Sequence, residues 1–473
     1  MPSSLSACKR LAALGLVAAF PCLVSGQAGL VPQEGEFPVS GPRPGEQTFP
    51  GLGINPGGGY VVWQDNGMDG IGKGLGIGAL RLDAALTPSG APFRVNQILP
   101  GDQEKPQVAM LNNGGAAFVW QGGLPGFQNI YARFTGANGA FVTPQDVLVG
   151  SGPLLIPLPY TTNWATIRNN RVTWRSFRVP RSIKAVREFS VNPVVTGLAD
   201  GNAVVAYSSR RKFTTNDQIL VLQTQWTGSI ILSNTLLTAS VRSVDFMQDV
   251  YVQRFTPAGV KLGVEFRANQ HTAFNQHHAA VAALHNGNFV VAWVSELQRG
   301  ENRVDIYARI FDASGAALTD EFLVNTADRI CASPAVSGLP DGGFTTAWSQ
   351  KDAARDNGLD IYARVFNAGG QAASDAFRVN SSTYGDQYAP SIVTLPAGQL
   401  VTWNSRGNQA AIFGCMVKDS AVNGGQFQVN STASARLLSP VAASDGVGHA
   451  LVIWSAYVPD SSIDLFGQRY VNP

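Results

Sequence analysis

Hydrophobic residues in this chain occur in short runs instead of at helical spacing. Between Pro334 and Asn380 there are four such runs, PAVSGL, FTTAW, DIYARVF and AFRVN, each five to seven residues long and separated by glycine, aspartate or proline. This pattern predicts four antiparallel β-strands, called A to D in chain order. Strand B is apolar on consecutive positions, as expected for a sheet covered on both faces. Because so small a unit cannot bury both faces alone, we expect copies to stack.

The aromatic residue that ends strand B shows how many copies there are. It recurs as Trp63, Trp120, Tyr207, Trp293, Trp348, Trp403 and Trp454. Four of the six steps between them span 51 to 57 residues, and the other two span 87 and 86, so two steps carry insertions, at about 150–188 and 210–248. The sequence therefore predicts an all-β fold, a seven-bladed β-propeller of four-stranded antiparallel blades occupying 27–473.

The two ends of the chain predict how the ring closes. The seventh unit stops after strand C, so it lacks strand D. The segment EFPVSGPRPGEQTFP aligns Phe37, Val39 and Ser40 with Phe93, Val95 and Asn96, the strand D of the first unit. We therefore expect the N-terminal strand to complete the last blade and to cover its open edge.

Residues 1–26 have the pattern of a secretory signal peptide. Lys9 and Arg10 precede the apolar run Leu11 to Phe20, and small residues follow. No later stretch is long enough to span a bilayer as a helix, so we expect an exported protein, secreted or at the cell surface. Without these residues the chain has 32 basic and 32 acidic side chains, which gives no reason to expect a nucleic-acid partner. Cys331 and Cys415 then remain, and their unrelated strand positions favour separate buried thiols over a disulfide.

Strands that alternate in direction place the D-to-A and B-to-C connections on one side of the ring, called the upper face. Four D-to-A loops repeat an acid or amide followed by glutamine: GEQTFP, GDQEKP, FNQHHA and GDQYAP. One interpretation is structural, in which these side chains cap loop amides and join neighbouring blades. The other is a ligand-binding ring for hydroxyl-rich ligands or a cation. Its members would be Glu46, Asp102, Asp386, Gln47, Gln103, Gln276 and Gln387. We predict no resident cofactor, with calcium in the channel as an open alternative.

Both insertions are predicted to emerge on the upper face as neighbours and to form a cap. The first is rich in arginine and tryptophan without an acid before Glu188. Its candidate ligand-binding residues are Arg168, Arg171, Trp174, Arg175 and Arg178. Guanidinium groups bind carboxylates or sulfates and tryptophan stacks on sugar faces, so an acidic glycan is one predicted partner. A solvated loop or a subunit contact is the alternative.

Four histidines, His271, His277, His278 and His285, lie within fifteen residues. Strand A separates His285 from the others by about 20 Å, which argues against a four-histidine metal site. We predict no metal site here, although His271 with His277 or His278 stays an alternative. The glycosylation patterns at Asn380 and Asn430 coincide with the end of strand D in repeat after repeat, so we interpret both asparagines as structural.

The motifs I-Y-x-R-F, F-x-V-N, G-D-Q-x-x-P and V-V-x-W together resemble repeats of exported bacterial β-propeller proteins that often occur beside adhesion modules. The resemblance covers nearly all of the chain outside the insertions and residues 1–26. It implies a seven-bladed propeller at or outside the cell surface. It supplies no catalytic residues, and blades two and three depart from it because of the insertions.

The sequence leaves three functions open. The leading hypothesis is a non-catalytic binding or adhesion propeller whose upper face recognises a glycan or an extracellular protein. A glycan-active enzyme, either a glycoside hydrolase or a polysaccharide lyase, is the second, because propellers can place paired carboxylates over the channel. Against it, Asp305, Asp360 and Asp464 recur at equivalent repeat positions, whereas catalytic residues should break the repeat. We therefore predict no catalytic residues. The third is a surface-assembly component. The sequence does not predict an oligomeric state.

Overall fold

The computed structural model describes residues 29–472 apart from 42, 71–73, 99, 125–127, 151–153, 169–170, 227–229, 352–357, 408–409, 433, 435 and 460–461. For 154–188 and 211–246 it describes the backbone alone. The predicted signal peptide lies outside the described residues. No bilayer-spanning helix occurs in the described part of the chain.

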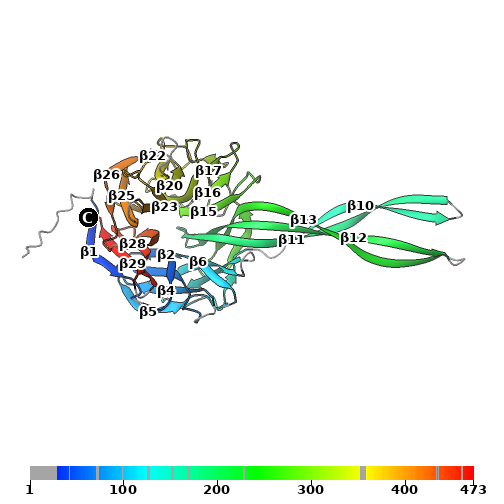
Figure 1. Ribbon diagram of the computed structural model, residues 1–473, viewed down its shortest axis with the longest axis horizontal. Coiled ribbons are helices and arrows are strands. Elements are labelled where there is room, and N and C mark those ends of the chain that lie inside the picture. Colours follow the sequence, from blue (N-terminus) through cyan, green and yellow to red (C-terminus); the bar gives the residue numbers. More distant parts are fainter. Residues whose placement is uncertain are drawn as a thin grey trace, which may run out of the picture.

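The chain folds into seven antiparallel sheets that surround a common centre (Figure 1). Blade 1 contains β2 (Gln47–Asn55), β3 (Gly58–Asp65), β4 (Gly76–Leu82) and β5 (Pro88–Arg94), and blade 2 contains β6 (Asp102–Met110), β7 (Ala116–Gly123), β8 (Asn129–Thr135) and β9 (Val147–Leu148). Blade 3 contains β11 (Arg171–Gly197), β12 (Ala203–Trp226), β13 (Ile230–Phe255) and β14 (Lys261–Arg267), with β10 (Leu154–Arg168) as a fifth strand.

Blades 4 to 6 follow the predicted repeat. Blade 4 contains β15 (Gln276–Ala283), β16 (Phe289–Glu296), β17 (Val304–Phe311) and β18 (Phe322–Leu323). Blade 5 contains β19 (Cys331–Gly338), β20 (Phe344–Lys351), β21 (Leu359–Phe366) and β22 (Phe377–Arg378), and blade 6 contains β23 (Asp386–Leu395), β24 (Gly398–Arg406), β25 (Ala410–Lys418) and β26 (Ala421–Gln428). The first strand of each blade contacts the first strand of the next, so the A strands line the centre of the ring.

Blade 7 is completed by the N-terminal strand, as predicted. Its sheet has the order β1 (Val31–Pro38), β29 (Ser462–Val471), β28 (His449–Val458) and β27 (Leu437–Ser444). Phe37 lies opposite Gly467, and the amide of Val39 donates to the carbonyl of Leu465 at 2.9 Å. The two ends of the chain therefore share one sheet, which covers the edge that β29 would otherwise expose.

The hydrophobic core lies between blades instead of within them. Seven clusters of buried side chains occur among the described residues, one between each pair of consecutive blades. Trp403 of blade 6 packs with Ala347 and Ile361 of blade 5, and Val39 packs with Trp63 and Leu451 where blade 7 meets blade 1. Both faces of each central strand are thus covered, which explains why strand B is apolar on consecutive positions.

The arginine of the IYAR motif joins neighbouring blades. Arg364 donates from Nη1 to the carbonyl of Val324 in blade 4 at 3.0 Å and from Nε to the carbonyl of Ser374 at 3.0 Å. Its guanidinium carbon lies 5.4 Å from the centre of the Phe366 ring. Arg133 and Arg309 make equivalent bonds to the preceding blade. This repeated arginine is therefore part of the scaffold.

The two insertions form strands, which the sequence analysis did not predict. β10 and β11 pair from Leu154 opposite Ala185 to Arg168 opposite Arg171, and β12 and β13 pair out to Trp226 opposite Ile230. β11 pairs with β12 only from Gly197 to Ile183, so the two hairpins separate beyond that point. They are neighbours, as predicted, and Figure 1 shows both running outward from the ring. A cap over the upper face stays a prediction, because the side chains of these segments lie outside the description.

Cys331 in β19 and Cys415 in β25 are buried and free, which confirms the prediction of separate thiols. Burial raises the pKa of Cys331 to about 12 and that of Cys415 to about 11. Neither thiol ionises readily near neutral pH, so both are inert core residues.

Candidate functional site

Every A strand carries a β-bulge near the upper face. In each blade the pairing of strands A and B shifts register at this bulge, for example between Tyr388 and Ser391 in blade 6. Within each shift lies one non-glycine residue with φ between 50° and 54°. These seven bulge residues are Phe49, Lys105, Asn192, His278, Ser333, Ala389 and Ser439. Six of them precede a proline. Proline has no backbone N–H, so none is left unpaired where the bulge interrupts the hydrogen bonds between the strands.

The bulges are held in place by bonds between blades. The amide of Asn192 donates to Oε1 of Gln121 at 3.0 Å, and that of Ala389 donates to Oγ of Ser349 at 3.2 Å. In each case the acceptor directly follows the aromatic residue of strand B in the preceding blade. The backbone is therefore alike around the ring, whereas the side chains are aromatic, cationic, amide, imidazole, hydroxyl or methyl. We call these seven residues the mouth ring.

Lys105 is the lysine of the mouth ring. Its Nζ donates to Oδ1 of Asn192, the next member of the ring, at 2.6 Å. Burial lowers the pKa of Lys105, and the nearby Glu104 carboxylate opposes that shift. Among the described residues Lys105 forms no ion pair within 4 Å, because Glu104 accepts instead from Gln121 at 2.8 Å. The ammonium group thus binds a neutral amide and has no ion pair among the described residues.

His278 ends a short chain of hydrogen bonds. Its Nδ1 lies 2.6 Å from Nδ1 of His277, and Nε2 of His277 lies 2.9 Å from Oε1 of Glu296. Oε2 of Glu296 accepts from Asn275 at 2.9 Å. Burial among the surrounding protein atoms, together with the charges of His277 and Lys105, lowers the pKa of His278 to about 4. The residue as a whole is nevertheless exposed to solvent. The imidazole is therefore neutral at physiological pH.

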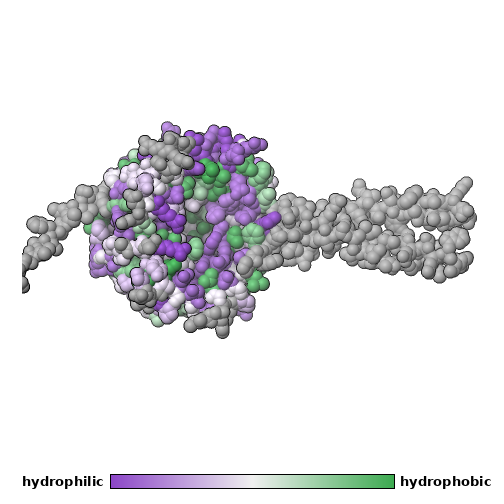
Figure 2. All heavy atoms as spheres, in the orientation of Figure 1, coloured by the Kyte–Doolittle hydropathy of each residue, from purple (hydrophilic) through white to green (hydrophobic). Residues whose placement is uncertain are grey.

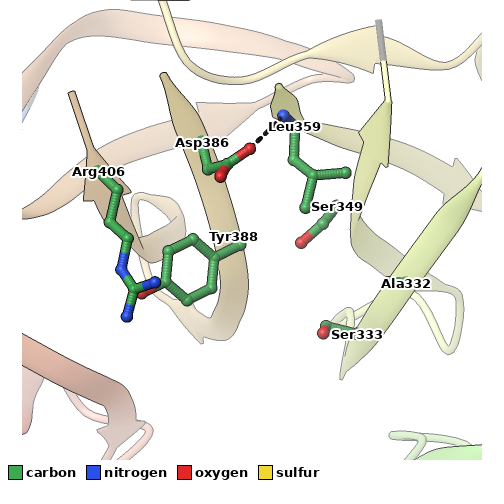
Figure 3. A pocket seen from close by; sticks show the side chains of 7 residues that line it. All are labelled: Ala332, Ser333, Ser349, Leu359, Asp386, Tyr388 and Arg406. Atoms are coloured by element: carbon green, nitrogen blue, oxygen red, sulfur yellow. Dashed lines mark hydrogen bonds between the residues drawn. The ribbon is translucent and has the colours of Figure 1, made fainter. Parts of the chain in front are cut away.

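A cavity of about 270 Å³ opens on the upper face between blades 5 and 6 (Figure 3). Ser333 of the mouth ring is one of its lining residues. On the opposite wall the guanidinium carbon of Arg406 lies 5.3 Å from the centre of the Tyr388 ring. Burial raises the pKa of Tyr388, and the Arg406 charge opposes that shift. The cavity thus offers an aromatic surface, a hydroxyl and a cation.

Exposed aromatic side chains gather on the same face. Phe49, Phe274, Tyr384 and Tyr457 are the exposed aromatics in the described part of the chain. Phe49 belongs to the mouth ring, Phe274 and Tyr384 lie in D-to-A loops, and Tyr457 lies where β28 ends on the upper face. Figure 2 shows that the visible surface of the ring is otherwise mostly hydrophilic, with hydrophobic residues scattered over it. The upper face therefore carries the side chains suited to contact with a flat apolar surface.

The acid-glutamine loops are mainly scaffold. Gln103 and Gln387 are buried, and each accepts a hydrogen bond from the indole of its own blade, Gln387 from Trp403 at 2.9 Å. The ligand-binding interpretation is therefore wrong for these glutamines, because their side chains point into the blade. Asp102 accepts from the amide of Leu75 at 3.1 Å, which joins blade 2 to blade 1 as the structural interpretation predicted.

The other two acids of these loops differ in exposure. Asp386 accepts from the amide of Leu359 at 3.0 Å, and it also lines the cavity between blades 5 and 6. Glu46 is exposed, and its amide donates to Asn66. A ligand-binding role for Glu46, Asp102 and Asp386 stays a prediction.

The arginine and tryptophan candidates lie on the hairpin of β10 and β11. Arg168 pairs with Arg171 at its tip, Trp174 lies opposite Ala165, Arg175 opposite Trp164 and Arg178 opposite Thr161. Their side chains lie outside the described residues, so recognition by them stays a prediction.

The remaining sequence candidates are structural. Asn380 is buried, accepts from the amide of Ile361 at 2.7 Å and donates to Asp360 at 2.7 Å. Asn325 repeats this pair with Asp305. Asn430 is buried at the equivalent place, so the structural interpretation of both glycosylation patterns agrees with the geometry. No group of three or more histidine, cysteine, aspartate or glutamate side chains forms a metal site within the described part.

Sequence reasoning missed the mouth ring, since no single residue type marks it. The available signal was the residue before the proline of strand A, which recurs at a fixed position while its identity changes.

No protein-family model and no curated protein matches the sequence. Among solved structures, a protein of unknown function from Dyadobacter fermentans DSM 18053 has a TM-score of 0.47 and 12% identity, covering 80% of this chain and 97% of that one. An α-L-arabinanase from Penicillium chrysogenum, complexed with arabinobiose, has a TM-score of 0.38 and 12% identity, covering 77% and 92%. The endosialidase of phage phi92 has a TM-score of 0.43 and 11% identity, covering 94% and 69%. With TM-scores below 0.5, these likenesses say nothing about the ligand of this chain.

Proposed function

We propose that this chain is an exported, non-catalytic binding propeller that recognises a glycan through its upper face. The observation that carries the proposal is the contrast within the mouth ring, where seven blades keep one backbone geometry but present different side chains. A residue needed only by the scaffold tends to keep its type, as the motif arginine, asparagine and glutamine do in several blades. The variable ring is therefore the part of the repeat that is free to serve a ligand.

The chemistry of the upper face suits a sugar. Sugars present hydroxyl groups that both donate and accept hydrogen bonds, and apolar faces that aromatic rings cover. Lys105, Asn192 and Ser439 supply donors and acceptors at the mouth, while Phe274 and Tyr384 supply exposed rings in the surrounding loops. Neutral overall charge agrees with a ligand selected by local contacts instead of by a long-range field.

The basic hairpin of β10 and β11 is proposed as a second contact with an acidic glycan. Arg171, Arg175 and Arg178 lie on one strand of it. Replacing all three with alanine is expected to weaken binding to acidic glycans and to leave neutral glycans unaffected. Equal binding by the variant would remove the hairpin from the site without affecting the mouth ring.

A glycan array probed with the chain expressed without residues 1–26 tests the main proposal. We expect binding to a defined glycan class that is lost, at least about tenfold in affinity, in Lys105→Ala or Tyr384→Ala. Val264→Ala is the matched control, because Val264 is 83% exposed on β14, away from the upper face. Absence of any bound glycan, or equal loss in the control variant, would contradict the proposal.

A glycan-active enzyme is the second candidate, and one observation favours it. The hydrogen-bonded chain from Glu296 through His277 to His278 can hold an imidazole with a free nitrogen at the mouth, which is the arrangement a general base needs. Incubating bound glycans with the protein and assaying new reducing ends decides between the two. Turnover that disappears in His278→Ala would replace the binding proposal with an enzymatic one.

A further inference from the structure

The chain of Glu296, His277 and His278 restricts where protons can lie. A carboxylate only accepts hydrogen bonds, so Nε2 of His277, at 2.9 Å from Oε1 of Glu296, must carry a proton. The two Nδ1 atoms, 2.6 Å apart, must share one proton between them. The pair in its neutral state therefore holds two protons, one at Nε2 of His277 and one between the rings. Nε2 of His278 then has no proton and is a hydrogen-bond acceptor.

Uptake of one proton by the pair changes Nε2 of His278 from a hydrogen-bond acceptor to a donor. If the added charge resides on His277, its Nδ1 donates to Nδ1 of His278, and neutral His278 carries its own proton at Nε2. If the charge resides on His278, both of its nitrogens carry protons. In either arrangement Nε2 of His278 becomes a donor. A second added proton would leave a proton on each Nδ1 and break the bond between the rings.

The groups around His278 come from blades 2, 3 and 4. Ser208 of β12 accepts from the amide of His278 at 3.1 Å, which fixes the backbone of the bulge. Lys105 of β6 is close enough for its charge to lower the pKa of His278. Asn192 of β11 contacts Lys105, and it lies between Lys105 and His278 in the mouth ring. Two acids lie next to these groups. Glu104 accepts a hydrogen bond from Gln121. Glu296 is hydrogen-bonded to His277 and Asn275.

Nε2 of His278 takes part in no hydrogen bond among the described residues, and the side chain is exposed. The Lys105 ammonium is likewise without an ion pair there. Lys105 of blade 2 and His278 of blade 4 thus lie on either side of Asn192 of blade 3, and Nε2 of His278 becomes a donor only after protonation. Together they match an oxyanion, which accepts hydrogen bonds at several oxygens and favours a cation beside it.

We propose that Lys105, Asn192 and His278 form a subsite for a carboxylate or sulfate group of an acidic glycan, and that the subsite strengthens when the histidine pair takes up a proton. This rests on the proposed function, since it names the ligand class of the same face. In the two-proton state the Nε2 lone pair repels an oxyanion and accepts from a sugar hydroxyl instead. In the three-proton state it donates to the oxyanion.

Calorimetric titrations at about pH 4 and about pH 8 test the subsite, because the pKa of His278 is lowered to about 4. The probes are tetragalacturonate, a heparin tetrasaccharide and the neutral, carboxyl-reduced form of tetragalacturonate. At least one acidic probe should bind about tenfold more tightly at the lower pH, as a gained hydrogen bond to a charged group implies, and the neutral probe should show no such change. His278→Gln should remove the pH dependence, and Lys105→Met should weaken acidic probes at both pH values.

His285→Gln is the matched control, because His285 is exposed beyond the other end of β15 and lies outside the hydrogen-bonded chain. If acidic probes bind equally at both pH values, or if His278→Gln keeps the pH dependence, the subsite proposal is wrong. If only neutral glycans bind on the array and in solution, the glycan-binding proposal holds and the oxyanion subsite is wrong. If no glycan binds at all, both proposals are wrong.

The proton arrangement has a readout that needs no ligand. Long-range proton-nitrogen correlation spectra of the ¹⁵N-histidine-labelled chain at about pH 8 should show His278 protonated at Nδ1 and His277 at Nε2. The opposite tautomer of His278 at that pH would overturn the switch even if the glycan proposal holds.

Discussion

Nε1 of Trp403 donates a hydrogen bond to Oε1 of Gln387 at 2.9 Å, and both side chains are buried. Equivalent bonds join Trp120 to Gln103 and Trp293 to Gln276. In blade 7 a leucine, Leu437, stands at the glutamine position. There the indole N–H of Trp454 is buried without a partner among the described residues.

Replacing Gln387 with leucine should destabilise the protein by about 1–3 kcal/mol, because the indole N–H of Trp403 is then buried without an acceptor. Urea unfolding measures the change. The converse variant, Leu437→Gln, gives Trp454 an acceptor and should be neutral or stabilise by about 1 kcal/mol. A loss below about 0.5 kcal/mol for Gln387→Leu would contradict this role of the glutamine.

The N-terminal strand should be essential for closing the ring. Val39 is 2% exposed between blades 7 and 1, so Val39→Asp buries an unpaired charge and should cost about 3–5 kcal/mol. Val260→Asp, at a residue 61% exposed, should change stability by less than about 0.5 kcal/mol. Deleting residues 29–40 should lower the melting temperature, and a peptide of that sequence added in trans should raise it again. No response to the peptide would show that the strand does not act by pairing with β29.

The strained bulge predicts an unusual response to glycine. Ala389 has φ 52°, a conformation that costs a residue with a Cβ about 1–2 kcal/mol. Ala389→Gly removes that cost but raises the conformational entropy of the unfolded chain. The two effects oppose each other, so the free energy of unfolding should stay level or rise. Ala363→Gly, in the middle of β21 and fully buried, should instead destabilise by about 1–2 kcal/mol. Equal losses in the two variants would argue against a strained bulge.

The two buried thiols should resist alkylation in the folded state. Their raised pKa values, about 12 for Cys331 and about 11 for Cys415, leave little thiolate at pH 8. Iodoacetamide followed by mass spectrometry should find neither thiol modified in native buffer and both modified in urea. Fast modification of either one in the native protein would mean that its blade opens locally.

The scaffold was predictable from sequence because it repeats. Seven strand-B aromatics set the number of blades, and the alignment of Phe37 and Val39 with the strand D of blade 1 predicted that the N-terminal strand completes blade 7. The burial of Cys331 and Cys415 likewise followed from their strand positions. Each of these features depends on a short sequence pattern whose position in the repeat is known.

The candidate site was predicted only in part. The upper face was identified as the loop-rich side, yet glutamines that one of the two interpretations placed at its mouth are buried against tryptophans. Repetition is ambiguous in sequence, since a repeated polar residue can face a ligand or the core, and only its hydrogen-bond partner decides which. The insertions were recognised from the spacing of the aromatics, but nothing in their composition indicated that they continue the strands of blade 3.

The sequence by itself determined the number of blades, the strands of each and the way the ends meet, because these depend on hydrophobic spacing and turn residues that act over short distances. The tertiary structure alone decided which side chains share the mouth. Lys105, Asn192 and His278 are about 87 residues apart in successive steps along the chain, and they become neighbours only when closure of the ring brings equivalent bulges of adjacent blades together.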